Sequence, residues 1–185
     1  MEDMAARRIL QLGDPALRLV SVPVVDLSSA SAVIQDLEDT LAAFRRTHGF
    51  GRAISAIQIG SAVRVIFCLV DGVRHELINP EWTLRGEEKF WLWDDCFSFP
   101  NLMVWLDRSR YVRLRHQNRA GEWLEIEASD GMAELIQHEM DHLDGVLAVN
   151  RARGAHALST RDEWIRRHGA PPDYSSSSTL FSDVP

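Results

Sequence analysis

The sequence predicts an α+β fold in which mixed or antiparallel sheets pack against helices. Three observations carry this prediction. The periodic segments follow the order helix, several strands, helix, whereas a doubly wound parallel fold alternates strands and helices. Two pairs of strand-like segments are joined by tight-turn sequences, which is typical of antiparallel hairpins. A chain of 185 residues, 45% hydrophobic and 25% charged, fits one globular domain with its own core.

The first helix is predicted over residues 30–46. The residues around its start, 26–31 (Asp-Leu-Ser-Ser-Ala-Ser), are rich in side chains that cap helix N-termini. An apolar stripe at helical spacing follows, formed by Val33, Ile34, Leu37, Leu41 and Phe44. This pattern indicates an amphipathic helix with one face against the core.

Two hairpins are predicted in the middle of the chain. In each, two apolar or alternating runs flank a short segment rich in Asp, Asn and Gly, which favours a tight turn. They are residues 62–70 and 75–78 around the Asp71-Gly72 turn, and residues 111–116 and 123–128 around the turn at 118–121.

The C-terminal part is predicted to hold two helices and a tail. Residues 132–143 are helical in pattern, and residues 157–168 form a shorter helix with a few apolar residues among charges. Residues 169–185 are rich in Pro and Ser and lack hydrophobic periodicity. We therefore expect one domain over residues 1–168, followed by a disordered tail.

Composition argues against several classes of protein. The net charge is −7 at pH 7, and of the 20 basic residues only Lys89 is a lysine. We therefore expect neither a nucleic-acid binder nor a polybasic membrane anchor. The first ten residues carry charges where a signal peptide is apolar, and no apolar run is long enough to span a membrane. Two cysteines, Cys68 and Cys96, make no disulfide framework, so a cytoplasmic protein is predicted.

The predicted helix over residues 132–143 carries a metal-binding motif. His138-Glu139-Met-Asp-His142 matches H-E-x-x-H, and residues four apart lie on one helical face, so both imidazoles can bind one ion. Glu139 can accept a proton from water at that ion. Apolar neighbours in the same segment indicate a packed helix rather than two histidines on a solvated face.

A third protein ligand distinguishes the families that share this motif, because a catalytic zinc-type site has three protein ligands and an open position. The metzincin pattern requires a histidine where this chain has Ala148. A thermolysin-like peptidase would use a downstream glutamate, for which Glu163 is suitably spaced. The other candidate is Cys96, which lies between two aspartates and a Phe-Ser-Phe-Pro segment, unlike Cys68 in its apolar strand.

Three short motifs occur in order along the chain. They are Gly51-Arg-Ala-Ile-Ser-Ala-Ile-Gln58, Asp94-Asp-Cys-Phe-Ser98 and Gln137-His-Glu-Met-Asp-His142. They resemble the motifs G-x-G-L-A-A-x-Q, E-G-C-L-S and Q-H-E-x-D-H of the peptide deformylases, in that family's order and at comparable spacing. Flanking segments at residues 13–18, 77–80 and 143–147 agree as well, so the resemblance covers roughly residues 7–150.

The resemblance implies an α+β metalloenzyme in which sheets pack around a central helix carrying H-E-x-x-H. Such an enzyme removes an N-formyl group by hydrolysis, and its substrate is an N-formylated peptide or small molecule. It uses one divalent metal ion, typically Fe(II), with Zn, Ni or Co able to replace it. The oligomeric state is not predicted by this resemblance.

The resemblance also assigns roles to individual residues. Cys96, His138 and His142 match the metal ligands, and Glu139 matches the general base. Gln58 and the backbone N–H of Phe97 match the donors to the formyl oxygen. The residues expected around the substrate are Gly51, Arg52, Ala53, Asp94 and Glu134.

The chain departs from the family pattern around the substrate, while the expected ligands and base are retained. Ser55 replaces an alanine and Asp95 a glycine, where the family pattern could require a positive φ or a close approach. Arg52 and Glu134 hold positions that line the pocket for the methionine side chain in the family. Unpaired charges facing a thioether pocket are costly, so we expect these two to pair or to be solvated.

We hypothesise that Arg52 and Glu134 either pair and close the pocket or bind a polar substrate. A smaller or polar N-formyl compound would then be preferred over formyl-methionyl peptides. Two alternatives to this function remain at this point. One is a catalytically impaired homologue that keeps its metal and has a binding or regulatory role. The other is an H-E-x-x-H metallopeptidase that uses Glu163 in place of Cys96.

Overall fold

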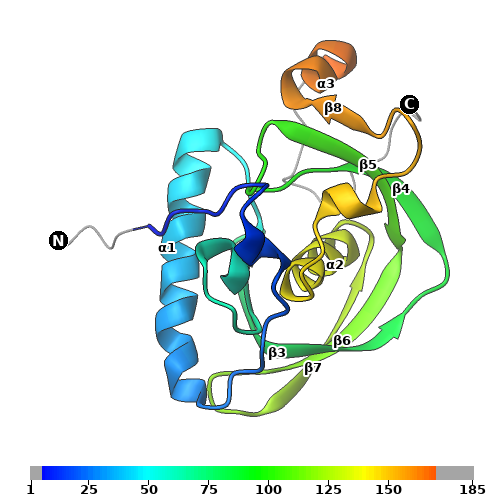
Figure 1. The fold of residues 1–185 in the computed structure, drawn as a ribbon. Coiled ribbons are helices and arrows are strands. Elements are labelled where there is room, and N and C mark those ends of the chain that lie inside the picture. Colours follow the sequence, from blue (N-terminus) through cyan, green and yellow to red (C-terminus); the bar gives the residue numbers. More distant parts are fainter. Residues whose placement is uncertain (1–5, 170–185) are drawn as a thin grey trace.

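Two antiparallel sheets surround a central helix, α2, in the computed structural model of the chain, which describes residues 6–169 (Figure 1). The α-helices of this part are α1 (Ala30–His48), α2 (Asp130–Leu143) and α3 (Arg161–His168). The strands are β1 (Ala53–Ser55), β2 (Val65–Val70), β3 (Val73–Arg85), β4 (Lys89–Asp94), β5 (Leu102–Ser109), β6 (Tyr111–Gln117), β7 (Trp123–Ser129) and β8 (Leu158–Thr160). Short 3₁₀ turns are η1 (Pro15–Arg18), η2 (Leu27–Ser29), η3 (Ala56–Ile59) and η4 (Ala148–Arg151).

Both sheets are antiparallel throughout, which confirms the predicted α+β class. The larger sheet has the strand order β1-β2-β3-β6-β7, and the smaller one has the order β4-β5-β8. The two predicted hairpins are the pairs β2-β3 and β6-β7. Within residues 6–169, strand β1 lies at the edge of the larger sheet and pairs with β2.

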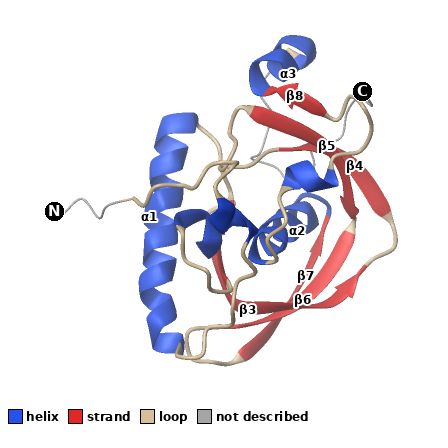
Figure 2. Cartoon of the chain, in the orientation of Figure 1, coloured by secondary structure: helices blue, strands red, loops and turns tan. Residues whose placement is uncertain are grey.

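The larger sheet separates two apolar cores, because successive side chains of a strand point to opposite faces. Phe67 of β2 belongs to the core shared with α1, whereas Ile66 belongs to the core shared with α2. Helix α2 also contacts β5 of the smaller sheet and is therefore enclosed between the two sheets (Figure 2). Nearly all its residues are buried, so each polar side chain on it needs a partner inside the protein.

Helix α1 ends where the functional site begins. It extends two residues beyond the predicted segment 30–46, and its apolar stripe is buried against the larger sheet. Gly49 ends the helix in the left-handed conformation, with φ 77°, and its N–H donates to the Arg45 carbonyl. The chain then passes through residues 50–52 into β1, which brings the first of the three motifs beside α2.

The helix predicted over residues 157–168 is shorter than expected. Its first residues pair with β5 as strand β8, and α3 begins at Arg161. The Thr160 side chain accepts a hydrogen bond from the Glu163 N–H at 3.3 Å, which caps the helix at this point. Because strand pairing satisfies the backbone of residues 158–160, the helix cannot start earlier.

Two segments remain to be compared with the prediction, strands β4 and β5 and the tail. Strands β4 and β5 were not predicted, although β4 alternates between exposed and buried positions at its start. The predicted tail, residues 169–185, lies outside the described residues except for Gly169, which ends α3 with φ 80°. The boundary of the predicted domain at residue 168 therefore stays a prediction.

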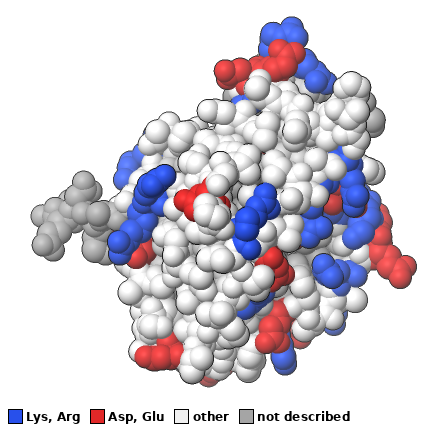
Figure 3. Space-filling view, in the orientation of Figure 1, with Lys and Arg blue, Asp and Glu red and all other residues white. Residues whose placement is uncertain are grey.

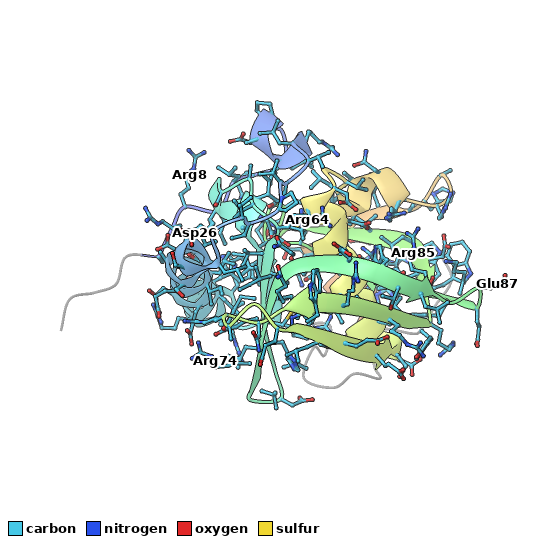
Figure 4. The ribbon with its side chains drawn as sticks, turned by 90° about the horizontal axis from the view of Figure 1, so that it is seen from below. Arg8, Asp26, Arg64, Arg74, Arg85 and Glu87 are labelled. Carbon is cyan, nitrogen blue, oxygen red and sulfur yellow. The ribbon has the colours of Figure 1, made fainter. Side chains whose placement is uncertain are left out.

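Charged side chains of both signs are interspersed on the face shown in Figure 3, without a continuous basic surface. In Figure 4, Arg8 and Glu87 point outward at opposite sides of the molecule. Among the helices described within residues 6–169, none has the length and apolar character that a membrane span requires.

Candidate metal centre

The two histidines of H-E-x-x-H face one point inside the protein. His138 and His142 lie one turn apart on α2, both are buried, and their Nε2 atoms are 3.1 Å apart. The Cys96 Sγ lies 3.2 Å from the His142 Nε2. Within the described residues, these three side chains form a group whose ligand atoms all lie within 4.8 Å of one another.

This donor set fits a divalent metal ion. Tetrahedral coordination with metal–nitrogen bonds of about 2.05 Å and metal–sulfur bonds of about 2.3 Å separates neighbouring donors by roughly 3.4–3.6 Å. The observed separations of 3.1 and 3.2 Å are close to those edges. Burial and the neighbouring His138 lower the pKa of His142, which keeps a lone pair available for a metal. Burial raises the pKa of the Cys96 thiol, and a bound cation would reverse that effect.

Cys96 is presented by the loop that follows β4. The Ser98 N–H points to its sulfur at 3.4 Å, and the Gln58 amide nitrogen lies 3.5 Å from the same atom. Cys68, by contrast, is fully buried on β2, and burial raises the pKa of its thiol far above the ordinary value. The two cysteines therefore differ as the sequence indicated, with one in an apolar core and the other beside the histidines.

A buried ion-pair network orients the first histidine. The His138 Nδ1 lies 2.8 Å from an Asp94 carboxylate oxygen, which leaves Nε2 directed at the candidate metal position. Arg108 donates to the other Asp94 oxygen at 2.6 Å and to Asp141 at 3.0 Å. Although burial would raise it, the pKa of Asp94 lies below its ordinary value because His138 and Arg108 stabilise the carboxylate.

Asp94 was predicted to contact the substrate, but the structure places it behind His138, away from the cavity. Arg108, which holds that aspartate in place, was not predicted from the sequence, and neither was strand β5, on which it lies. A single arginine in a segment without a clear strand pattern does not indicate that it will pair with a buried aspartate.

The expected general base, Glu139, is buried beside the three candidate ligands. The Ser55 hydroxyl lies 2.5 Å from its Oε2 atom and 3.0 Å from its backbone carbonyl. Burial raises the pKa of Glu139, while His138 and the Ser55 hydroxyl oppose that rise. Ser55 also donates its backbone N–H to the Gln58 Oε1 at 3.0 Å, which turns the Gln58 amide nitrogen toward Cys96. One residue of β1 thus orients two of the expected catalytic side chains.

Phe97 packs closely against the segment that leads into β1. A Cβ atom at Gly51, where φ is 126°, would lie 2.5 Å from the Phe97 ring, so a side chain is excluded at this position. The Phe97 ring also stacks on Phe44 of α1, with centroids 3.9 Å apart. Its backbone N–H belongs to the loop that presents Cys96.

A cavity opens at this group of residues. Its lining includes two of the three candidate ligands, Cys96 and His138, together with Glu139 and Gln58. It also includes four of the five residues that were expected around the substrate, all except Asp94. The lining residues are Phe50, Gly51, Arg52, Ala53, Gln58, Asp95, Cys96, Phe97, Glu134, Leu135, His138 and Glu139. The volume of this cavity is about 30 Å³.

Arg52 and Glu134 pair across this cavity. The Arg52 NH2 group lies 2.7 Å from the Glu134 Oε2, and its NH1 group donates to the Gly131 carbonyl at 3.2 Å. Both side chains are largely buried, with 12% and 4% exposed. Burial raises the pKa of Glu134, and Arg52 opposes that rise. The hypothesis that these two charges pair with each other is therefore confirmed by their geometry.

Glu163, the ligand of the alternative peptidase, lies elsewhere. It is on α3, where its carboxylate accepts two hydrogen bonds from Arg166 at 2.6 and 2.8 Å. It does not belong to the ligand group that contains Cys96. The arrangement therefore favours Cys96 as the third ligand.

The fold and the site together define a metal-dependent hydrolase, and comparisons with known proteins identify its family. A family model described as polypeptide deformylase matches residues 6–157. Peptide deformylase 2 of Clostridium perfringens is 36% identical over 157 residues, covering 84% of this chain and 98% of that protein. The peptide deformylase of Pseudothermotoga lettingae is 37% identical over 172 residues, covering 91% and 96%.

Solved structures agree with this assignment. The crystal structure of peptide deformylase from Thermotoga maritima has a TM-score of 0.74 and 31% identity, covering 81% of this chain and 99% of that one. The chain therefore belongs to the peptide deformylase family, whose members are metal-dependent hydrolases that remove formyl groups from N-formylated peptides. The matched segment ends before α3, so that helix lies outside the family model.

Proposed function

We propose that this chain hydrolyses the N-formyl group of a small or polar N-formyl compound, with Cys96, His138 and His142 as metal ligands. The resemblance favours Fe(II), with Zn, Ni or Co able to replace it. When bound, the divalent ion supplies a Lewis acid that makes water a stronger nucleophile at neutral pH. The two unpaired, buried cysteines are consistent with the reducing cytoplasm as its compartment.

The chain's own residues supply proton transfer and charge stabilisation. Glu139 accepts the proton of the water that attacks the formyl carbon and then delivers it to the leaving amine nitrogen. The Gln58 amide and the Phe97 N–H donate hydrogen bonds to the oxygen that becomes negatively charged as the carbon turns tetrahedral. Ser55 holds both Glu139 and Gln58, so the base and the donor keep a fixed relation to each other.

The choice of substrate rests on one observation, the Arg52–Glu134 ion pair in the cavity. The pair lines a cavity of about 30 Å³, so a methionine side chain that enters between these two residues would have to displace the pair. Separating the two charges to admit an apolar thioether would break this ion pair in a buried site, which is costly. A hydrogen or a short polar group requires no such separation.

The test measures formate release by the iron-loaded enzyme without oxygen, on formyl amino-acid amides of one length. Formyl-glycine and formyl-serine amides are expected to have kcat/KM values at least tenfold above that of formyl-methionine amide. Efficient and selective use of the methionine compound would overturn the proposed substrate. Metal retained at one equivalent, with no formate from any formyl compound, would instead indicate the binding or regulatory role.

A further inference from the structure

Two features outside the family pattern meet at the rim of the cavity. One is Asp95, which stands where the second motif of the family has a glycine and which lines the cavity. The non-glycine residues with positive φ within the described part are Asp71, Asn79 and Asp130, so Asp95 adopts an ordinary backbone conformation. The other is Arg161, the first residue of α3, which follows the end of the matched segment.

Arg161 connects two segments that wall the cavity. Its NH2 group forms an ion pair with the Asp95 carboxylate, and its guanidinium carbon lies 4.2 Å from the centroid of the Phe50 ring. Phe50 precedes β1, whereas Asp95 follows β4, and both line the cavity. One guanidinium therefore joins parts of the wall that are 45 positions apart, from residue 50 to residue 95.

The connection is held firmly in place. The Arg161 Nε donates to the Pro100 carbonyl at 2.6 Å, and its backbone N–H donates to the Asn101 carbonyl at 2.8 Å. Only 13% of the Arg161 side chain and 14% of the Asp95 side chain are exposed. The preceding strand β8 is paired to β5, so both the backbone and the guanidinium group of Arg161 are held in position.

We propose that Arg161 is a specificity-determining residue that limits substrate length, which rests on the proposed deformylase function and deepens it. A formyl group placed between Glu139 and Gln58 leaves the rest of the substrate to extend past the walls that Arg161 joins. The substrate class is therefore single formylated amino acids or amines, and longer peptides meet the Arg161–Asp95 connection.

The experiment compares two substrates that share the first side chain and differ in length, formyl-alanine amide and formyl-Ala-Ala-Ser. For the unmodified enzyme, kcat/KM is expected to be at least tenfold higher for the short compound. Arg161→Gln and Asp95→Ala should each lower this ratio at least tenfold, mainly through a smaller KM for the tripeptide. The double variant should match the single ones, because both substitutions remove the same connection.

Arg166→Gln is the matched control, because Arg166 lies on the same helix and pairs with the exposed Glu163 outside the cavity. It should leave the length ratio unchanged. A ratio within twofold of the unmodified enzyme in both Arg161→Gln and Asp95→Ala, with thermal melts that show folded protein, would overturn the inference. Equal use of both lengths by the unmodified enzyme would overturn it as well. Preferred use of formyl-methionine amide over formyl-glycine and formyl-serine amides would contradict the proposed function. It would not change the ratio of kcat/KM between the short and the long substrate, so failure of the proposed function and failure of this inference can be told apart.

Discussion

Replacing the Arg52–Glu134 ion pair by apolar residues should restore a pocket for methionine. The pair is 2.7 Å long, with 12% and 4% of its side chains exposed, so each charge stabilises the other in a buried setting. Removing one partner of such a buried pair costs about 3–5 kcal/mol, whereas replacing both by well-packed apolar residues is often neutral or stabilising. We therefore expect Arg52→Ile and Glu134→Ile to destabilise the fold singly, and the double variant to recover most of that loss.

The same double variant should gain activity on formyl-methionine amide. Full burial of a methionine side chain contributes about 1.5–3 kcal/mol. Because about 1.4 kcal/mol corresponds to a factor of ten, kcat/KM for this substrate should rise roughly 10- to 150-fold. Activity on formyl-serine amide should fall, since Arg52 and Glu134 can then no longer form a hydrogen bond with the hydroxyl.

Urea unfolding gives the stabilities and formate release gives kcat/KM. The control is Arg115→Ile, because Arg115 forms an equally short ion pair with Glu81 at 2.6 Å but both side chains are about half exposed, at 52% and 49%. That substitution should change stability by less than about 1 kcal/mol. If the double variant is as unstable as the worse single one, or its kcat/KM for formyl-methionine amide does not change, the ion pair does not close the pocket.

Three further predictions concern the ligands, the base and the pH dependence. Cys96→Ser should abolish stoichiometric metal binding, measured by atomic emission, whereas Glu163→Ala should retain it. Metal retained by Cys96→Ser and lost from Glu163→Ala would refute the ligand assignment. Ser55→Ala should lower kcat about tenfold and change KM by less than twofold, because a hydrogen bond to the charged Glu139 is lost. An equal change in kcat and KM would argue against a role of Ser55 in positioning Glu139. Burial lowers the pKa of His116, so the unfolded state binds more protons and stability should fall as the pH drops below about 6.5. Urea midpoints at pH 7.5 and 5 should therefore differ less in His116→Gln than in the unmodified protein, and equal differences would contradict this assignment.

The sequence predicts the site better than it predicts the framework around it. His138, Glu139 and His142 are four positions or fewer apart on one helix, so their relation follows from helical geometry alone. Cys96 could be placed beside them only through the family resemblance, because 42 positions separate it from His138. Arg108 could not be predicted, since its role depends on how β5 packs against α2.

The local patterns explain which elements were predicted and which were not. Helix α1 carries a regular apolar stripe and a capping segment, so both its existence and its approximate ends follow from sequence. Strand β8 is only three residues long and gains its structure from pairing with β5, which no local pattern encodes. Tertiary pairing of this kind determines the start of α3 and, with it, the position of Arg161.

Taken together, the departures from the family motifs follow one physical rule. Arg52, Asp95 and Ser55 each introduce a polar group near a buried site, where an unpaired charge is costly, and each has a partner on another element. Arg52 pairs with α2, Asp95 pairs with α3, and Ser55 donates to Glu139. The ligands and the base keep the family pattern, whereas two of the three pairs lie on the walls of the cavity. Because these two pairs touch the space for substrate rather than the reacting atoms, the proposed change of substrate requires no change in the chemistry of formyl hydrolysis.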